Sequence, residues 1–184
     1  MSAVSTDLRR LMPEDASMYR QIRLEALADS PDAFASTLEL EEERPLDWFA
    51  ARLADAFVLG AFDGQDLMGV AGFYIQPGPK HGHKGMLWGM YVRPEYRSAG
   101  VGRVLVEAIV DHARDRVEIL QLFVVSDNTP ARRLYTSLGF IEYGHERHAT
   151  KYRGLYHDDV LMALPLPVET DASIGDARAE EIPA

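Results

Sequence analysis

A strand-like run, a turn with an arginine and two glycines, and an amphipathic helix follow one another in the middle of the chain. The turn, residues 97–102, reads Arg-Ser-Ala-Gly-Val-Gly, and apolar residues then recur at helical spacing over residues 101–113. Glycines let a ligand approach the backbone closely, and the N-terminus of a helix attracts negative charge through its free N–H groups. The pattern predicts a site for a phosphate-bearing ligand.

Three phosphate-binding patterns compete for this turn. A P-loop requires Lys and then Ser or Thr after the last glycine, where this chain has Arg103 and Val104. A dinucleotide-binding fingerprint requires a third small residue, where Leu105 stands, and belongs to a first βα unit rather than to the middle of a chain. The pattern Arg/Gln-x-x-Gly-x-Gly/Ala is matched in full. Taken alone, the six residues leave an ordinary helix start with turn glycines equally open.

The order of strand and helix patterns predicts a mixed α/β layer fold rather than a doubly wound sheet. Strands are expected at residues 6–11, 56–62, 67–75, 84–92, 118–125, 140–152 and 155–164, and helices at residues 13–28, 34–43, 46–54, 101–113 and 129–138.

Length and composition indicate one domain with an acidic tail. The 184 residues are 47% hydrophobic, which suits a single domain over residues 1–165. Residues 168–184 hold five acids and one arginine, and we expect residues 166–184 to be a disordered tail. The net charge of −10 argues against a nucleic-acid partner. A polar start and the lack of a long apolar run predict a cytoplasmic protein without a membrane partner.

Cysteine is absent, which excludes a cysteine nucleophile and a thiolate metal site. His81 and His83 lack further ligands nearby in the sequence, so we expect no metal.

Two linked segments identify the best match for the turn. Residues 90–102 read MYVRPEYRSAGVG, residues 125–140 read VSDNTPARRLYTSLGF, and residues 156–162 read YHDDVLM. Over residues 6–164 the chain resembles the GCN5-related N-acetyltransferase (GNAT) superfamily. The resemblance implies a central, mostly antiparallel mixed sheet that splays between its fourth and fifth strands and is flanked by helices. It also implies acetyl-CoA as acyl donor.

The resemblance implies a set of cofactor-binding residues on the fourth strand, the turn and the helix after the fifth strand. These are Met90, Tyr91, Val92, Arg97, Ser98, Ala99, Gly100, Val101, Gly102, Arg103, Asn128, Ala131 and Tyr135. Backbone groups of the fourth strand would hold the acetyl oxygen. For Asn128 a helix-capping role is an equal alternative, and for Arg103 so is a solvent-exposed position on the helix.

Tyr135 is the predicted catalytic acid. A phenol within reach could protonate the departing thiolate of CoA. Residues 131, 134, 135 and 138 share one helix face, so the alternative for Tyr135 is a core aromatic.

The general base is not evident from the sequence. Some relatives carry a glutamate on the fifth strand, where this chain has Phe123. Other candidate bases are the acidic residues of the second helical stretch, Glu39, Glu41, Glu42 and Glu43. Glu39 and Glu42 share a helix face and are candidate acceptor-site residues, with Phe34 and Trp88 as candidate pocket walls. His81 and His83 are alternatives that would act through water. Core packing is the competing interpretation for both aromatic residues.

The predicted function is transfer of acetyl from acetyl-CoA to a primary amine of a small molecule or peptide, by direct attack. The alternatives are a catalytically impaired CoA-binding sensor or interaction module of the same fold, and a nucleotide-binding protein. The acceptor stays open. The resemblance suggests a homodimer, but the sequence does not decide the oligomeric state.

Overall fold

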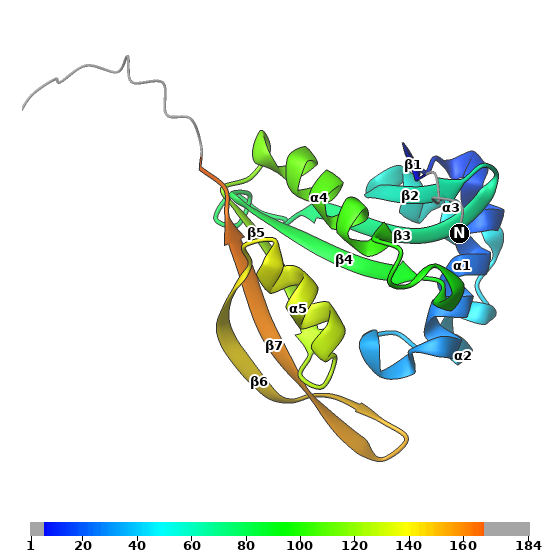
Figure 1. The fold of residues 1–184 in the computed structure, drawn as a ribbon. Coiled ribbons are helices and arrows are strands. Elements are labelled where there is room, and N and C mark those ends of the chain that lie inside the picture. The colour runs from blue at the N-terminus through cyan, green and yellow to red at the C-terminus, as the bar shows by residue number, and fades with distance from the viewer. Residues whose placement is uncertain (1–5, 168–184) are drawn as a thin grey trace, which may run out of the picture.

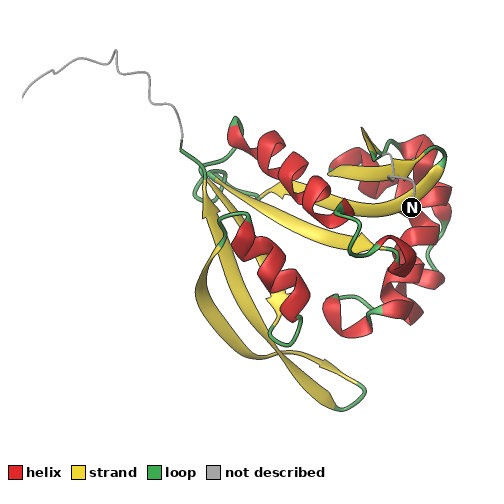
Figure 2. Ribbon diagram, viewed as in Figure 1, coloured by secondary structure: helices red, strands yellow, loops and turns green. Residues whose placement is uncertain are grey.

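The predicted order of strands and helices is confirmed in a computed structural model, which describes residues 6–167. Figures 1 and 2 show one sheet with helices on both faces. The strands are β1 (Asp7–Arg10), β2 (Phe57–Asp63), β3 (Asp66–Ile75), β4 (Lys84–Val92), β5 (Ile119–Val125), β6 (Ile141–Tyr152) and β7 (Leu155–Pro165). The helices are α1 (Ala16–Asp29), α2 (Leu38–Glu42), α3 (Leu46–Asp55), α4 (Val101–Arg114) and α5 (Thr129–Ser137), with short 3₁₀ turns at Pro13–Asp15, Pro31–Ala33 and Pro94–Tyr96.

The seven strands form one mixed sheet in the order β1-β2-β3-β4-β5-β7-β6. Neighbouring strands run antiparallel except β4 and β5, which run parallel. This confirms the predicted mixed, mostly antiparallel sheet.

The sheet splits between β4 and β5. Only three residue pairs join the two strands, from Lys84 with Ile119 to Met86 with Gln121. Beyond them the strands diverge and leave a V-shaped opening in the ribbon (Figure 1). The predicted splay is therefore confirmed, and within residues 6–167 no strand pairs with residues 87–92 of β4 on the β5 side.

A β-bulge bends β4 where the split begins. Gly72 pairs with Trp88 and Val70 pairs with Tyr91, so β4 contains one residue more than β3 between these pairs. Gly89 lies in the bulge with φ of +61°, a left-handed conformation that glycine adopts without strain.

Two hydrophobic clusters cover the two faces of the sheet. On one face, the apolar stripe of α4 packs against the sheet together with Phe140, which follows α5. The stripe includes the fully buried Leu105 and Ile109. On the other face, Ile22 of α1 and Phe49 of α3 pack over β2 and β3.

The second predicted helix begins later than expected. Residues 34–37 are not helical, so the prediction of a helix from Phe34 is wrong over this stretch. Thr37 is the N-cap of α2, and its hydroxyl accepts a hydrogen bond from the N–H of Leu40. The three non-helical residues before the cap, 34–36, line a cavity.

The end of β7 leads to the limit of the described chain. Leu166 is buried and its N–H donates to the carbonyl of Glu118. The remainder of the predicted tail, residues 168–184, lies outside the described residues. Over residues 6–167, no helix has both the length and the apolar character needed to cross a membrane.

Candidate active site

The turn singled out in the sequence presents free backbone donors at the start of α4. Gly100 is the N-cap, with φ of +87°. Within residues 6–167, the N–H groups of Val101, Gly102 and Arg103 have no hydrogen-bond acceptor, as expected for a first helical turn. Ser98 also adopts a positive φ, of +65°, which is strained for a residue with a side chain. The arrangement suits the binding of a phosphate group.

Gly102 serves close packing as well. A Cβ atom at this position would lie 2.8 Å from Cε of Met90 and 3.4 Å from Cδ2 of Leu134. The first turn of α4 therefore lies directly against β4 and α5. Because residue 102 is glycine, the first turn of α4 and its free N–H groups can lie close to the split in the sheet.

Both predicted arginines have partners on the protein. The Arg97 guanidinium donates to the carbonyl of Val92 at 3.0 Å and to the carboxylate of Asp29, and it lies over the Tyr91 ring. The bond from Arg97 lowers the pKa of Asp29. Arg97 thus ties the segment between β4 and α4 to the end of α1.

Arg103 links α4 to α5. It donates to the hydroxyl of Ser137 at 2.7 Å and forms an exposed ion pair with Glu107. It is exposed, as the alternative interpretation expected, but it also holds the two helices that flank the split.

Asn128 caps α5. Its side-chain oxygen accepts a hydrogen bond from the N–H of Ala131 at 3.2 Å. The capping interpretation is therefore confirmed, and cofactor contacts of Asn128 and Ala131 stay predictions. Ala131 packs against the cluster on the α4 side of the sheet, as does Met90 of β4.

Tyr135 lies on the inward face of α5. It is 6% exposed, and its ring meets Phe140 edge to face at 5.8 Å. Its hydroxyl makes no hydrogen bond within residues 6–167. Burial raises the pKa of the phenol, which therefore stays protonated at neutral pH. Tyr135 is a core aromatic whose phenol stays protonated, and its role as catalytic acid stays a prediction.

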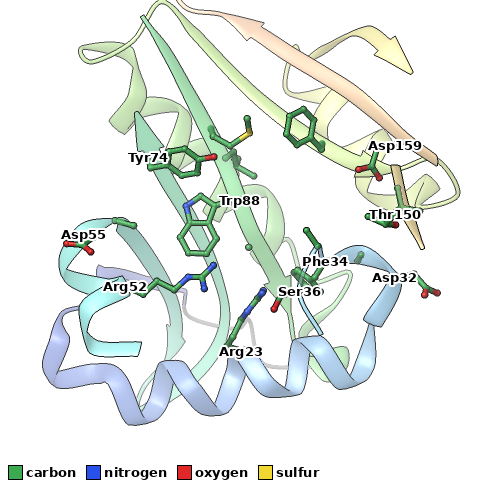
Figure 3. Close-up of a pocket in the computed structure, with 18 of the residues that line it drawn as sticks. Arg23, Asp32, Phe34, Ser36, Arg52, Asp55, Tyr74, Trp88, Thr150 and Asp159 are labelled. Carbon is green, nitrogen blue, oxygen red and sulfur yellow. The ribbon is translucent and has the colours of Figure 1, made fainter. Parts of the chain in front are cut away.

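A cavity of about 790 Å³ opens where β4 and β5 part (Figure 3). Its walls come from the segment before α2, from α3, from β4 and from the pair β5–β7. The β4 wall includes Trp88 and Gly89, and the β5 wall includes Phe123 and Val125. The cavity therefore reaches the split itself, on the face covered by α1 and α3.

Two of the four candidate acceptor residues line this cavity. Phe34 and Trp88 both contribute to its wall. Trp88 fits because Gly72 has no side chain: a Cβ there would lie 2.5 Å from the indole. Glu39 and Glu42 are exposed on α2 and do not line it; Glu39 forms an exposed ion pair with Arg153. His81 and His83, the alternative bases, also lie outside the cavity wall.

Asp159 of β7 is a cavity carboxylate that the sequence analysis missed. It pairs with Val125 in the antiparallel β5–β7 ladder, so both residues and Phe123 share one face of the sheet. Burial, followed by the negative charges of Glu146 and Asp158, raises the pKa of Asp159. A carboxylate of this kind is a better proton acceptor than an ordinary one.

Arg52 of α3 and the Gly89 bulge were also missed. An isolated glycine within a strand pattern predicts a bulge, so the bulge at Gly89 could have been predicted from the sequence. Arg52 had none, because its place in the cavity depends on how α3 packs against the sheet.

Comparison with known families decides the assignment. Residues 20–140 match the model of the Acetyltransferase (GNAT) family. The chain belongs to the GNAT family. The predicted membership is confirmed, and the split sheet and free helix N-terminus of this chain are consistent with it.

Two curated acetyltransferases are similar to this GNAT chain. A mycothiol acetyltransferase of Thermomonospora curvata is 34% identical over 131 residues, which are 70% of this chain and 41% of the relative. A [ribosomal protein bS18]-alanine N-acetyltransferase of Escherichia coli K12 is 37% identical over 81 residues, 44% of this chain and 55% of the relative. The matches thus span about two fifths to a little over half of the relatives' length.

The fold of this GNAT chain also matches solved structures. The Salmonella typhimurium protein yncA, solved with its cofactor acetyl-CoA, superposes with a TM-score of 0.76. It shares 22% sequence identity, and the match covers 95% of this chain and 99% of that one. At this identity the likeness shows the fold.

Proposed function

We propose that the chain is an acetyl-CoA-dependent N-acetyltransferase that acts on a primary amine of a small molecule or peptide. The proposal rests on the split between β4 and β5, which has the free N–H groups of α4 on one side and the cavity on the other. The split between β4 and β5 opens on one side toward the free N–H groups of α4. On the other side it opens into the cavity that holds Asp159. A donor and an acceptor could therefore meet within the split.

The residues around the split suit acetyl-CoA. The free N–H groups of Val101, Gly102 and Arg103 would hold the pyrophosphate, with the left-handed Gly100 at the entry to the helix. Residues 87–92 of β4 lack a partner strand on that side, so their backbone groups would bind the pantetheine amides and the acetyl oxygen. The cofactor when bound supplies the activated acetyl thioester.

Asp159 and Tyr135 would share the proton transfers. An alkylamine with a pKa of ~10.4 is only about one part in 10³ neutral at pH 7, so a base is needed. Asp159 would take the first proton from the ammonium group. The amine nitrogen then bonds to the acetyl carbon and the carbon–sulfur bond breaks. Tyr135 gives its proton to the sulfur and regains one from the nitrogen.

The names of the relatives are compatible with a broad range of acceptors. One is named for mycothiol and the other for an alanine of a ribosomal protein. The cavity of about 790 Å³ is of the size that holds a small molecule or the end of a peptide. The homodimer and the cytoplasmic location stay predictions.

The test is release of CoA by the purified protein with a panel of primary amines, together with calorimetric binding of acetyl-CoA. Turnover with at least one amine, confirmed by mass spectrometry of the acetylated product, is the expected result. Binding of acetyl-CoA without turnover on any amine would favour the sensor. No binding of acetyl-CoA, with tight binding of NAD or ATP, would overturn the proposal.

A further inference from the structure

Arg52 presents a cation to the cavity from between two aromatic rings. Its guanidinium carbon lies 5.0 Å from the ring centre of Trp48 and 4.7 Å from that of Trp88. In Figure 3 the side chain extends from α3 beneath Trp88 toward the middle of the cavity. Stacking on two indoles restricts the planar group and stabilises its charge without occupying its N–H edges.

The guanidinium N–H groups of Arg52 have no acceptor among the residues that the structure describes. Within residues 6–167, Arg52 forms no hydrogen bond and no ion pair. Asp55, one turn further along α3, points away from Arg52 in Figure 3. The second arginine of the cavity, Arg23, differs because Glu41 binds it at two points. Among the described residues that line the cavity, Arg52 is thus the cation whose donors are free.

The rest of the cavity sets the other properties of a ligand. The aromatic rings of Phe34, Trp88 and Phe123 supply apolar walls, and Asp159 supplies a carboxylate from β7. Arg52 and Asp159 stand on different walls in Figure 3, one on α3 and one on β7. A molecule that satisfies both needs a positive group and a negative group separated by an apolar body.

We propose that the acceptor is a small amino carboxylate, whose carboxylate binds Arg52 while its amine faces the split beside Asp159. The proposal rests on the acetyltransferase function above and specifies its substrate class. A guanidinium fork pairs with a carboxylate through two parallel N–H···O bonds. A ligand with this charge pattern leaves neither group uncompensated in the partly buried cavity.

The experiment uses matched acceptors. A series of amines with increasing separation between amine and carboxylate is compared with the corresponding primary carboxamides, and kcat/KM is measured from CoA release. At the best separation we expect the carboxylate to be preferred by about 10- to 100-fold. R52Q should reduce this ratio to near one, and R52K should lower it in part because a lysine lacks the planar fork.

R44Q is the matched control. Arg44 stacks on the same Trp48 at 5.7 Å but does not line the cavity, so R44Q should keep the wild-type preference. Equal kcat/KM for carboxylates and carboxamides in the wild-type protein would overturn the proposal. So would a preference that survives in a folded R52Q variant.

Calorimetry separates this proposal from the proposed function. Carboxylate members of the panel should bind wild-type protein, and R44Q, more tightly than R52Q, whether or not they are acetylated. Binding that depends on Arg52 without any turnover would refute the acetyltransferase function and keep a carboxylate site. Turnover of amines that does not depend on Arg52 would support the acetyltransferase function and refute the carboxylate site.

Discussion

The carboxylate of Glu41 accepts two hydrogen bonds from the guanidinium of Arg23, at 2.8 and 2.9 Å, beside the proposed acceptor cavity. Arg23 is 5% exposed and Glu41 is 2% exposed. The pair joins α1 to the five-residue α2. A helix this short is not stable alone, so the ion pair fixes the position of the segment that carries Phe34.

Glu41→Gln should destabilise the protein by about 3–5 kcal/mol, because it leaves the Arg23 charge buried with one weak partner. Urea unfolding followed by circular dichroism measures the loss. Glu42→Gln, an exposed neighbour on the same helix, is the control and should change stability little. Equal stability of both variants would contradict the structural role of the pair.

The same pair should contribute to acid sensitivity. Burial tends to raise the pKa of Glu41, but its bonds to Arg23 outweigh this and hold the pKa below its ordinary value of 4.5. A lowered pKa in the folded state stabilises the protein above pH 4.5 and is lost as pH falls through the folded pKa. Stability of wild-type protein should therefore fall more steeply than that of Glu41→Gln below about pH 4.5.

Tyr135→Phe should lower kcat by about 100-fold while the dissociation constant of acetyl-CoA changes less than about twofold. The phenol has no hydrogen-bond partner within residues 6–167, so its removal leaves the packing on Phe140 intact. Steady-state kinetics and calorimetry provide the two numbers. Tyr143→Phe removes an exposed hydroxyl that bonds Gln121 and should leave kcat near wild type. Unchanged kcat in Tyr135→Phe, with chemistry rate-limiting, would return Tyr135 to a packing role.

Asp159→Asn should remove the low-pH limb of the kcat/KM profile and lower its plateau by about 100-fold. The base must be ionised, so activity rises with pH through the pKa of Asp159, which burial and then Glu146 and Asp158 raise. His157 acts on this pKa in the opposite direction. Asp55→Asn, at another carboxylate of the cavity, should keep the limb. An identical profile in Asp159→Asn would exclude it as the base.

Gly100→Ala should weaken acetyl-CoA binding about tenfold, since an L residue with φ of +87° is strained and the turn would relax away from its present shape. Gly64→Ala provides a matched control. Gly64 lies in the β2–β3 turn with φ of +60°, and at both positions a Cβ would meet no atom within 4 Å. Both variants should lose similar stability, but only Gly100→Ala should lose affinity in calorimetry. Equal affinities of Gly100→Ala and Gly64→Ala for acetyl-CoA would show that the turn at Gly100 is not part of the cofactor site.

Local patterns were sufficient for most of the fold. Helix α4 has an apolar stripe and β4 has a strand pattern between turn residues, so their bounds were predicted nearly as observed. The start of α2 was missed because the acidic helical stretch was taken to begin at Phe34, whereas Thr37 caps the helix and decides where it begins.

The acceptor side of the site depends on register, which local patterns do not determine. Asp158 and Asp159 are adjacent on β7 and therefore point to opposite faces. Asp158 accepts a hydrogen bond from the N–H of His148, whereas Asp159 lines the cavity. Only the pairing of Asp159 with Val125 distinguishes them. The free N–H groups at the start of α4 were easier to predict because they are backbone atoms of one continuous segment.

The split sheet also bears on how the molecule avoids aggregation. Residues 87–92 of β4 form a strand edge without a partner, and such an edge on the outside of a protein invites pairing with another chain. Here the edge lies inside the molecule, between the starts of α4 and α5 on one face and the cavity on the other. An edge enclosed in this way is less accessible to the sheet of a second protein than an edge on the molecular surface. The split between β4 and β5 thus leaves the hydrogen-bonding groups of this edge unpaired and also protects them from pairing with another chain.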